Sequence, residues 1–459
     1  MLMAKLLGNF WAYLTLTWFT FFHADTYGQS SLDGYIREGL ANNLVIRQKN
    51  LTLQQAQQSL QIARSYFLPS VSLLGDYLSA EGGRNIAIPV GDLLNPVYST
   101  LNQLIGNPAF PTIGNVKQNF LPKNFYDVRL RTSVPLINTD LYGNRAIQSQ
   151  QIRMKQYELE VYKRELVAMI KTAYFHYLAA TQAVRIYESA RLLVNKNVEV
   201  NASLLRNGKG LSANYLRSKS EAEKITAELN GARNKQTNAR KYINFLLNKP
   251  LDTEVDETFS QGEPTLLDTA SAHTGNREEL LIIQTAKEIN ESQMRMSKLA
   301  RLPKVNAFLD LGSQAYDWRY NEQSRYYLLG IQLTVPLFQG FRNTMQIRQN
   351  GLELEKTGLN LTYTQNQLQM AAEVAGNELV TASRNYLASR GQLTSAQSYF
   401  TLIEKGYQQG VNSLIEYLDA RNQLTSSQLQ QLIRWFEMRM AEARLERETA
   451  SYSFEKDLP

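Results

Sequence analysis

An internal repeat constrains this 459-residue chain more than any other feature of its sequence. Three landmarks occur in the same order in both halves, and two of them recur after 201 and 202 residues. The first is Leu-Pro-Ser-Val at 68–71, which recurs as Leu-Pro-Lys-Val at 302–305. The second is Ser-Val-Pro-Leu at 133–136, which recurs as Thr-Val-Pro-Leu at 334–337. The third is a glycine before a Tyr-Leu pair, at Gly208 with Tyr215-Leu216 and at Gly410 with Tyr417-Leu418. This self-similarity indicates a tandem duplication. Each half is predicted to contain a helix, two strands, a long helix and a return helix.

The strands are predicted from alternation of side chains with a period of two. In the second half, one face carries Tyr327, Leu329, Ile331, Leu333 and Val335, and the other carries Gly330, Gln332 and Thr334. In the first half, Tyr126, Val128, Leu130, Thr132 and Val134 alternate with Asp127, Arg129, Arg131 and Ser133. The preceding strands, near 71–77 and 305–311, alternate in the same way. One apolar and one polar face is typical of a transmembrane barrel, although a soluble amphipathic sheet shows the same pattern.

Four strands per chain are too few to close a barrel. An open sheet edge in lipid leaves backbone groups unpaired, at a cost of several kcal/mol each. Other copies of the chain must therefore complete the barrel. Three copies give twelve strands, an even number within the bacterial range, while two or four copies remain open from the sequence alone.

The helices are predicted to be much longer than a compact domain needs. Proline is absent from 142–206 and from 341–405, and apolar residues recur there three and four positions apart. At 1.5 Å per residue, such a helix is about 100 Å long and must pack beside others as a coiled coil. Turns at 207–210 and 408–410 lead into return helices over 212–248 and 413–448, and shorter first helices are predicted over 32–66 and 276–301. A linker at 249–275, marked by proline and glycine, joins the first repeat (29–248) to the second (276–459).

The N-terminus is predicted to be a secretory signal over residues 1–28. Lys5 precedes an uncharged run from Leu6 to Phe22, and a polar exit follows. A membrane-anchoring helix is the alternative, but the run is short for that. No later segment is long and apolar enough to cross a bilayer as a helix. The chain has no cysteine, which excludes disulfides and thiolate metal sites.

Together, these features resemble the TolC-like outer-membrane efflux family over nearly all of the mature length. The resemblance rests on the repeat, the Leu-Pro entry to each outgoing strand, the Val-Pro-Leu exit into each long helix, and the Tyr407-x-x-Gly410 turn before Glu416-Tyr417-Leu418-Asp419-Ala420-Arg421. It implies a fold of mixed α and transmembrane β type, with a trimeric 12-stranded barrel that continues into a helical periplasmic tunnel. It also implies a passive outer-membrane conduit that docks a periplasmic adaptor protein and, through it, an inner-membrane pump.

The resemblance assigns roles to several residues. Tyr407, Glu416 and Asp419 match the family's tyrosine and acidic positions at the periplasmic aperture. Glu416 and Asp419 are three apart on one helix face, and the simpler interpretation is that both only solvate that face. The hairpin turns with Gly208, Gly210 and Gly410 are the expected adaptor-docking end, and Pro135 and Pro336 mark the strand–helix junctions.

One segment departs from the repeat. Residues 80–123 form a long insertion with five prolines between the first two strands, whereas the matching loop spans only about 317–324. Long loops of such barrels lie outside the cell, so the insertion is expected to be an extracellular loop. Its role does not follow from the sequence, and neither do the cargo and the class of pump.

No catalytic chemistry or cofactor site is predicted. Three scattered histidines offer no Ser-His-Asp arrangement, no metal site is indicated, and Glu278-Glu279 are read as ordinary helix-start acids. Asn-Gly-Lys-Gly at 207–210 falls between two helices and lacks the strand that precedes a phosphate loop. Scattered charges argue against nucleic acid as a partner. The main alternative is a soluble periplasmic coiled-coil scaffold, and a barrel enzyme such as an outer-membrane lipase is weaker still.

Overall fold

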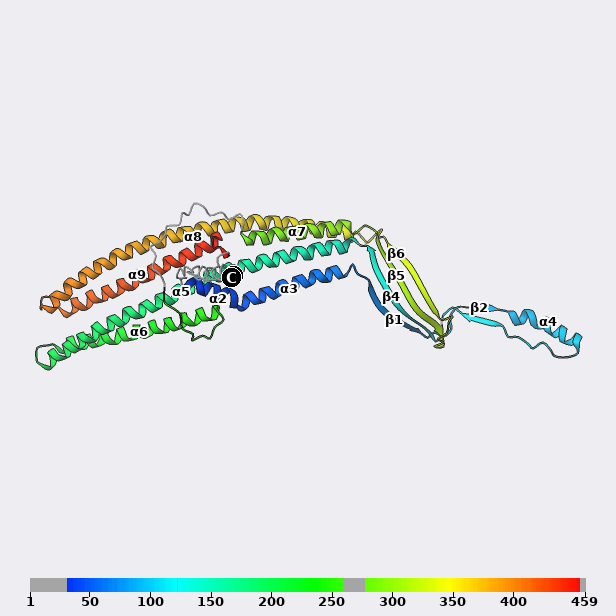
Figure 1. Cartoon of the computed structure of the whole chain (residues 1–459), viewed down its shortest axis with the longest axis horizontal. Coiled ribbons are helices and arrows are strands. Elements are labelled where there is room, and N and C mark those ends of the chain that lie inside the picture. The colour runs from blue at the N-terminus through cyan, green and yellow to red at the C-terminus, as the bar shows by residue number, and fades with distance from the viewer. Residues whose placement is uncertain (1–30, 122, 259–276, 455–459) are drawn as a thin grey trace, which may run out of the picture. The chain divides into compact units, whose positions relative to one another are not determined.

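A computed structural model describes residues 31–121, 123–258 and 277–454 (Figure 1). The predicted signal and most of the linker therefore lie outside the described residues. The first repeat contains α2 (Ser31–Asn42), α3 (Leu44–Ser65), β1 (Ser70–Leu78), β4 (Phe125–Ile137), α5 (Thr139–Arg206) and α6 (Ser212–Leu246). The second contains α7 (Glu278–Leu299), β5 (Lys304–Tyr316), β6 (Arg325–Thr334), α8 (Arg342–Gln408) and α9 (Leu414–Thr449). Apart from the division of the first helix into α2 and α3 and the elements of the insertion between β1 and β4, the elements follow the predicted order in each half.

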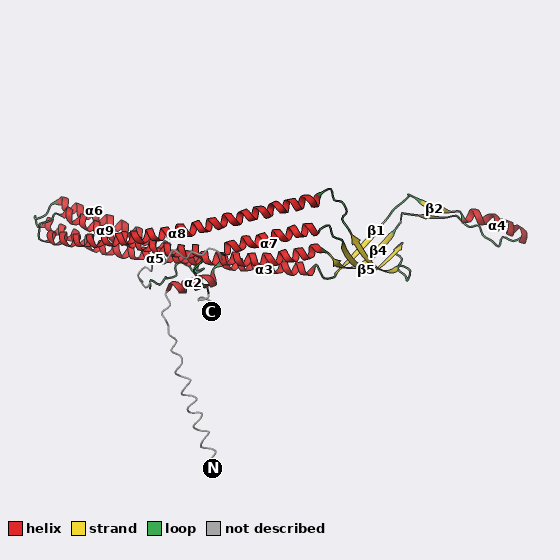
Figure 2. Cartoon of the chain, turned by 90° about the horizontal axis from the view of Figure 1, so that it is seen from above, coloured by secondary structure: helices red, strands yellow, loops and turns green. Residues whose placement is uncertain are grey.

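The chain divides into two compact units that each draw on both repeats. One unit contains residues 55–152 and 286–356, with all the strands, and the other contains the remaining residues, with the ends of the long helices. Helices α5 and α8 have 68 and 67 residues and are continuous. Figure 2 shows the contrast between these helices and the short strands.

The four long strands form one antiparallel sheet in the order β1-β4-β5-β6. Its register places the two repeats side by side through β4 and β5. Leu73, Leu130, Leu311 and Tyr327 pair in turn across the sheet in one row. The adjacent row contains Ser72, Arg131, Asp310 and Leu328. Because neighbouring rows point to opposite faces, the predicted apolar and polar faces are present.

The polar face is held together by ion pairs between strands. The Arg131 guanidinium donates two hydrogen bonds to the Asp310 carboxylate, at 2.7 and 2.6 Å. Arg129 forms an ion pair with Asp76 of β1 at 3.2 Å. Both pairs bridge neighbouring strands, so they fix the register that the alternation of apolar residues requires.

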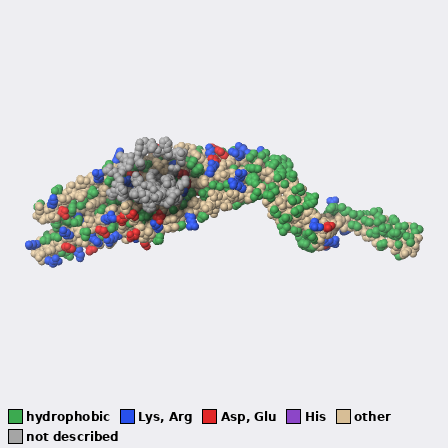
Figure 3. Space-filling view, viewed as in Figure 1, with side chains coloured by type: hydrophobic (Ala, Val, Ile, Leu, Met, Phe, Trp, Pro, Cys, Tyr) green, Lys and Arg blue, Asp and Glu red, His purple; other side chains and the backbone are tan. Residues whose placement is uncertain are grey.

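The apolar face of the sheet is uncovered in the single chain. Tyr327, Leu329 and Ile331 of β6 are more than 70% exposed. In the space-filling view, hydrophobic side chains gather over the strands and over the insertion, whereas most charged side chains lie over the helices (Figure 3). A water-exposed apolar patch of this extent indicates a surface that meets lipid or another chain.

The first helix differs from the prediction because it breaks at Asn43. The Asn43 side-chain oxygen accepts hydrogen bonds from the backbone N–H groups of Val45 and Ile46, which makes Asn43 the N-cap of α3. Its amide donates to the carbonyl of Leu246 at the end of α6, at 2.9 Å. One buried side chain thus starts one helix and ends another.

The main core lies in the helical unit. It contains Ile36 of α2, Leu166 and Tyr174 of α5, Ile243 of α6 and Met438 of α9, all buried. The Tyr174 hydroxyl donates to the carbonyl of Asp256 at 3.1 Å, and burial raises the pKa of Tyr174 to about 12. The described start of the linker is therefore anchored to the core.

The insertion is more ordered than the predicted loop. It contains a two-stranded hairpin, β2 (Asn85–Ile88) with β3 (Val116–Asn119), and between them a 16-residue helix, α4 (Val90–Ile105). Pro96 lies inside this helix, and Gly106 ends it in a left-handed conformation. The proline and glycine content that suggested a loop instead marks an internal position and a C-terminal stop.

Candidate functional site

The turn between α5 and α6 is a Schellman motif. The N–H of Gly208 donates to the carbonyl of Leu205 at 3.1 Å, and that of Lys209 donates to the carbonyl of Leu204 at 2.9 Å. Gly208 has a φ of +65°, which glycine adopts without the strain that a Cβ imposes. A Cβ built on Gly208 meets no atom within 4 Å, so its backbone conformation is the only constraint on this residue.

The turn between α8 and α9 repeats the motif. Gly410 and Val411 donate to the carbonyls of Tyr407 and Gly406, at 3.1 and 2.8 Å, and Gly410 has a φ of +77°. Here too a Cβ on the glycine would meet no atom within 4 Å. The sequence signal for the turn, a glycine that adopts a positive φ, is therefore the same in the two repeats, and both hairpins present an open glycine at their tips.

Gly210 is needed for a different reason, which is close approach. A Cβ at this position would lie 2.9 Å from the Cβ of Leu204. In the second turn, Gly406 occupies the position of Leu204, and Asn412 occupies that of Gly210. A Cβ on Gly406 would overlap the Asn412 side chain. Each turn thus pairs a glycine with a larger residue. The glycine is the later of the two residues in the first turn and the earlier of the two in the second turn.

Glu416 has a structural role that the sequence analysis did not assign. Its carboxylate accepts a hydrogen bond from the N–H of Ser413 at 2.6 Å, and its own N–H donates to the Ser413 hydroxyl oxygen at 3.3 Å. This reciprocal pair is a capping box at the start of α9. The bond from the Ser413 backbone, and then those from the side chains of Ser413 and Asn412, lower the pKa of Glu416. The carboxylate is exposed and ionised at neutral pH.

Asp419 lies almost one turn beyond Glu416 and is also exposed. The structure therefore brings both predicted acids to the same end of one hairpin, on its solvent side. Asn214 and Arg217 hold the equivalent places in the first repeat, so the acidic character belongs to the second hairpin alone. Whether the two acids line an aperture stays a prediction, because that requires neighbouring chains.

Tyr407 packs within its own hairpin. Its ring stacks on that of Tyr417 with 4.8 Å between centroids and an interplanar angle of 20°. On its other side, Tyr407 faces an open groove lined also by Lys196, Asn197 and Glu404. Tyr407 is thus placed between the two hairpins, with polar groups of α5 in the same groove. Among the described residues, the Tyr407 hydroxyl makes no hydrogen bond to a neighbouring helix.

A buried ion pair joins the two return helices, and sequence reasoning missed it. Arg421 of α9 donates to Glu221 of α6 at 2.9 Å, and both side chains are at most 6% exposed. Burial lowers the pKa of Arg421, although the Glu221 charge opposes this effect. The Nε and Nη1 atoms of Arg421 are buried and make no hydrogen bond within the described residues. No local pattern signals this pair, because Glu221 lies 200 residues before Arg421.

The two prolines at the strand ends differ in position. Pro135 lies inside β4, at an irregularity of the pairing with β5 between Pro135 and Ile137. Pro336 lies after the last residue of β6 and before α8. A strand tolerates proline at such an irregularity because the missing N–H is not needed for the ladder.

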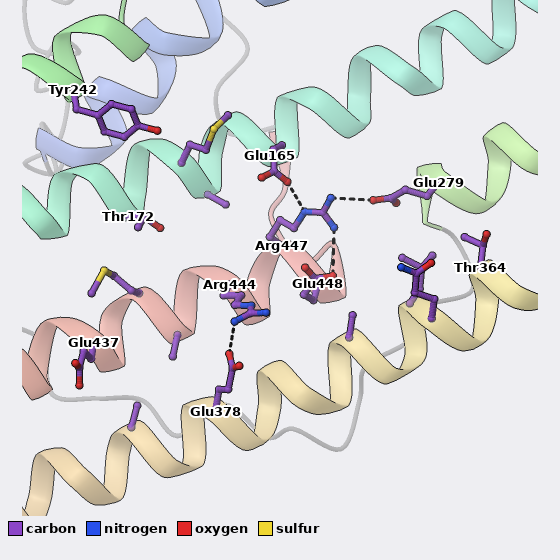
Figure 4. A pocket seen from close by; sticks show the side chains of 18 residues that line it. Glu165, Thr172, Tyr242, Glu279, Thr364, Glu378, Glu437, Arg444, Arg447 and Glu448 are labelled. Carbon is purple, nitrogen blue, oxygen red and sulfur yellow. Dashed lines mark hydrogen bonds and ion pairs between the residues drawn. The ribbon is translucent and has the colours of Figure 1, made fainter.

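A second candidate is a cavity of about 910 Å³ in the helical unit (Figure 4). Its polar lining consists mainly of paired charges. Arg447 donates to Glu165 at 2.8 Å and lies 3.3 Å from Glu279, and Arg444 donates to Glu378 at 2.7 Å. The lining has five glutamates and two arginines, and each of these glutamates forms an ion pair with an arginine, so no carboxylate of the lining is left unpaired for an ionic ligand.

Glu278 and Glu279 are more than helix-start acids. Glu278 accepts hydrogen bonds from Arg164 of α5 at 2.9 and 2.7 Å, and Glu279 accepts one from the buried Arg277 at 2.6 Å. Burial opposes ionisation of Glu279, but the bonds and charges of Arg277, with the charge of Arg447, lower its pKa. The beginning of α7 is thus bound to α5 and α9 by arginines.

The described part of the chain has no cluster of three or more histidine, cysteine or acidic side chains that could hold a metal ion. None of its helices combines the length and hydropathy needed to cross a membrane.

Comparison with protein families matches residues 272–453 to the family described as Outer membrane efflux protein. The match covers the second repeat, including the turn with Gly410 and the helix with Glu416 and Asp419. No curated protein matches the chain in sequence.

The chain is also similar in structure to solved outer-membrane proteins. A membrane protein from Pseudomonas aeruginosa gives a TM-score of 0.73 at 16% identity, over 92% of this chain and 94% of that one. The CmeC outer membrane channel of Campylobacter jejuni gives 0.72 at 14% identity, over 91% and 85%. The open state of the MtrE outer membrane channel of Neisseria gonorrhoeae gives 0.70 at 14% identity, over 92% and 89%. At these identities the likeness establishes the fold, which spans both repeats.

The buried ion pair generates a test by double substitution. We expect Arg421→Met to destabilise the helical unit by about 3–5 kcal/mol, because Glu221 is left buried and unpaired. Replacing both residues, as Glu221→Met with Arg421→Met, should recover most of that loss. Thermal unfolding followed by circular dichroism measures the effect. A double variant that is no more stable than Arg421→Met would contradict the pairing.

Proposed function

We propose that this chain, whose residues 272–453 match the outer membrane efflux protein family, is the outer-membrane channel of a tripartite efflux or type I secretion system. It acts as a passive conduit and not as an enzyme, with its sheet in the outer membrane and its long helices in the periplasm. The observation that carries this proposal is the four-stranded sheet, which has a charged face, an uncovered apolar face and unpaired edges at β1 and β6 among the described residues.

A homotrimer satisfies both requirements of that sheet. Pairing of β1 in one copy with β6 in the next removes every edge, and three four-stranded shares give a barrel of twelve strands. The apolar face then meets lipid, and the ion pairs of Arg131 with Asp310 and of Arg129 with Asp76 face water in the lumen. A soluble coiled-coil scaffold, the alternative from the sequence, leaves the apolar face of the sheet unexplained.

The hairpin tips are the proposed docking end for a periplasmic adaptor. Each tip exposes glycine backbone with no side chain above it, at Gly208 and at Gly410. A partner can therefore approach the backbone closely. The insertion at 80–123 joins the ends of β1 and β4 that lie away from α3 and α5, so by the same orientation it is extracellular.

The proposed gate is a ring of acids at the periplasmic aperture. Glu416 and Asp419 of three copies supply six carboxylates, and a ring of carboxylates attracts cations and repels anions. The capping box supports the proposal for Glu416, since it holds the carboxylate in one position at the helix start. Tyr407 closes the gate by contact across the groove that it shares with α5.

The oligomeric state and the orientation test the function directly. Native mass spectrometry in detergent should give a trimer, and the protein should stay in the membrane fraction after carbonate extraction. Because the chain has no cysteine, a Gln103→Cys variant offers a single thiol in the insertion. A membrane-impermeant maleimide should label it in intact cells. A stable monomer, or labelling only after permeabilisation, would refute the assembly or the topology.

Docking is tested with substitutions that separate backbone conformation from surface shape. Asparagine tolerates a positive φ, so Gly208→Asn and Gly410→Asn should keep both the fold and efflux. Gly208→Trp with Gly410→Trp should abolish efflux in a deletion background while the trimer remains. Growth under a substrate of the pump gives the readout. Normal tolerance in the tryptophan variant, at normal trimer level, would place the docking surface elsewhere.

The aperture is tested by single-channel recording on planar bilayers. Glutamine can keep the capping box, so Glu416→Gln with Asp419→Asn removes two charges per chain without removing the cap. We expect lower cation selectivity and weaker block by multivalent cations added from the periplasmic side. Tyr407→Phe should raise the resting conductance. Unchanged selectivity and block in the neutralised channel would show that these carboxylates solvate a helix face and do not line the aperture.

A further inference from the structure

Helix α4 of the insertion has an uncovered apolar stripe with heptad spacing. Val90, Leu94, Val97, Leu101 and Leu104 follow one another at intervals of four, three, four and three residues. This is the spacing of the core seam of a coiled coil. Leu94, Val97 and Leu104 are 37%, 52% and 78% exposed, whereas Val90 and Leu101 are half-buried.

The opposite side of α4 already has its partner inside the chain. Asn95 exchanges two hydrogen bonds with the backbone of Ile113, at 2.9 and 2.8 Å. Asn102, two turns later, exchanges two with the backbone of Phe110, at 2.8 and 2.9 Å. The two amides thus hold the segment that returns from α4, at residues 110–113, through hydrogen bonds to its backbone, as a neighbouring strand in a sheet would. The returning segment is thereby fixed away from the apolar stripe.

The chemistry of the stripe identifies its occupant. Asp92 is the single charged residue of α4, and helices that lie on a membrane surface carry lysine and arginine on their polar face. In the heptad, leucine at 94 and 101 takes the a positions, and Val90, Val97 and Leu104 take the d positions. Two of the three d positions are thus β-branched and both a positions are leucine, the reverse of the arrangement that favours two helices, so three or four helices fit the pattern better than two.

The position at which the insertion joins the sheet agrees with a bundle of three helices. The insertion leaves the sheet at the end of β1, which is an edge strand. In the proposed trimer, β1 pairs with the next copy, so each insertion starts at a seam between subunits. Two heptads are too short to associate alone, but tethering to a barrel supplies a high effective concentration.

We propose that the three α4 helices of a trimer pack their stripes together as a parallel three-helix bundle above the extracellular mouth of the channel. The proposal rests on the proposed trimeric channel. The bundle ties the three insertions to one another through Val90, Leu94, Val97, Leu101 and Leu104, and it places an apolar plug of protein at the exit of the conduit.

Single-cysteine cross-linking on the purified trimer tests the bundle, because the natural chain has no cysteine. Leu94→Cys and Leu101→Cys, on the stripe, should shift from monomer to covalent dimer on a denaturing gel after copper phenanthroline or a short bismaleimide. Ser99→Cys, on the opposite face and exposed, is the matched control and should stay monomeric. Adding Val97→Asp to Leu94→Cys should abolish the cross-link while native mass spectrometry still finds the trimer.

The outcomes separate the two proposals. A protein without trimers refutes the channel assembly and the bundle together. A trimer in which positions 94 and 101 do not cross-link, or cross-link no more than position 99, refutes the bundle alone. In that case, quenching of a fluorophore at Leu101→Cys by brominated phosphatidylcholine in proteoliposomes would assign the stripe to the membrane.

Discussion

An unpaired sheet edge cannot remain in hydrocarbon, and the proposed assembly of the protein depends on that constraint. Each chain has four strands in one sheet with free edges at β1 and β6. Unpaired N–H and C=O groups there would cost several kcal/mol each. In the proposed membrane location, the backbone alone therefore requires further copies of the chain, before any side chain is considered. Side chains then decide which face meets lipid and which meets water.

The need for further copies of the chain also affects the helices. One residue separates β4 from α5, and residues 335–341 connect β6 to α8, so in the proposed barrel each copy also brings its hairpins to the assembly. Within one chain, the buried pair of Arg421 and Glu221 joins the second hairpin to the first. A buried pair of this kind is costly to break and gives little net stability when intact. It fixes which helices are neighbours more than it adds to the energy of the bundle.

Much of the fold could be predicted from the sequence because the repeat shows each element twice. Strands with a period of two and long helices without proline have local signals, and these were confirmed. The capping box of Ser413 and Glu416 was also readable, as a serine three residues before a glutamate. Helix α4 was missed because Pro96 and its neighbouring glycines suggested a loop, although its heptad spacing was present. Asn43 is a local N-cap signal, but its bond to the carbonyl of Leu246 and the pair of Arg421 with Glu221 join residues about 200 positions apart, and no local pattern contains such information.

The exchange of large and small residues between the two turns limits how the repeats can be recombined. Leu204 packs over Gly210 in one turn, whereas Gly406 packs under Asn412 in the other. A chimera that joins the first helix end to the second turn would force Leu204 and Asn412 into the space of one side chain. The reverse chimera would leave that space empty. Crossover points between the duplicated halves must therefore lie outside their turns. A substitution on one side of a turn persists only if the residue on the other side has a complementary size.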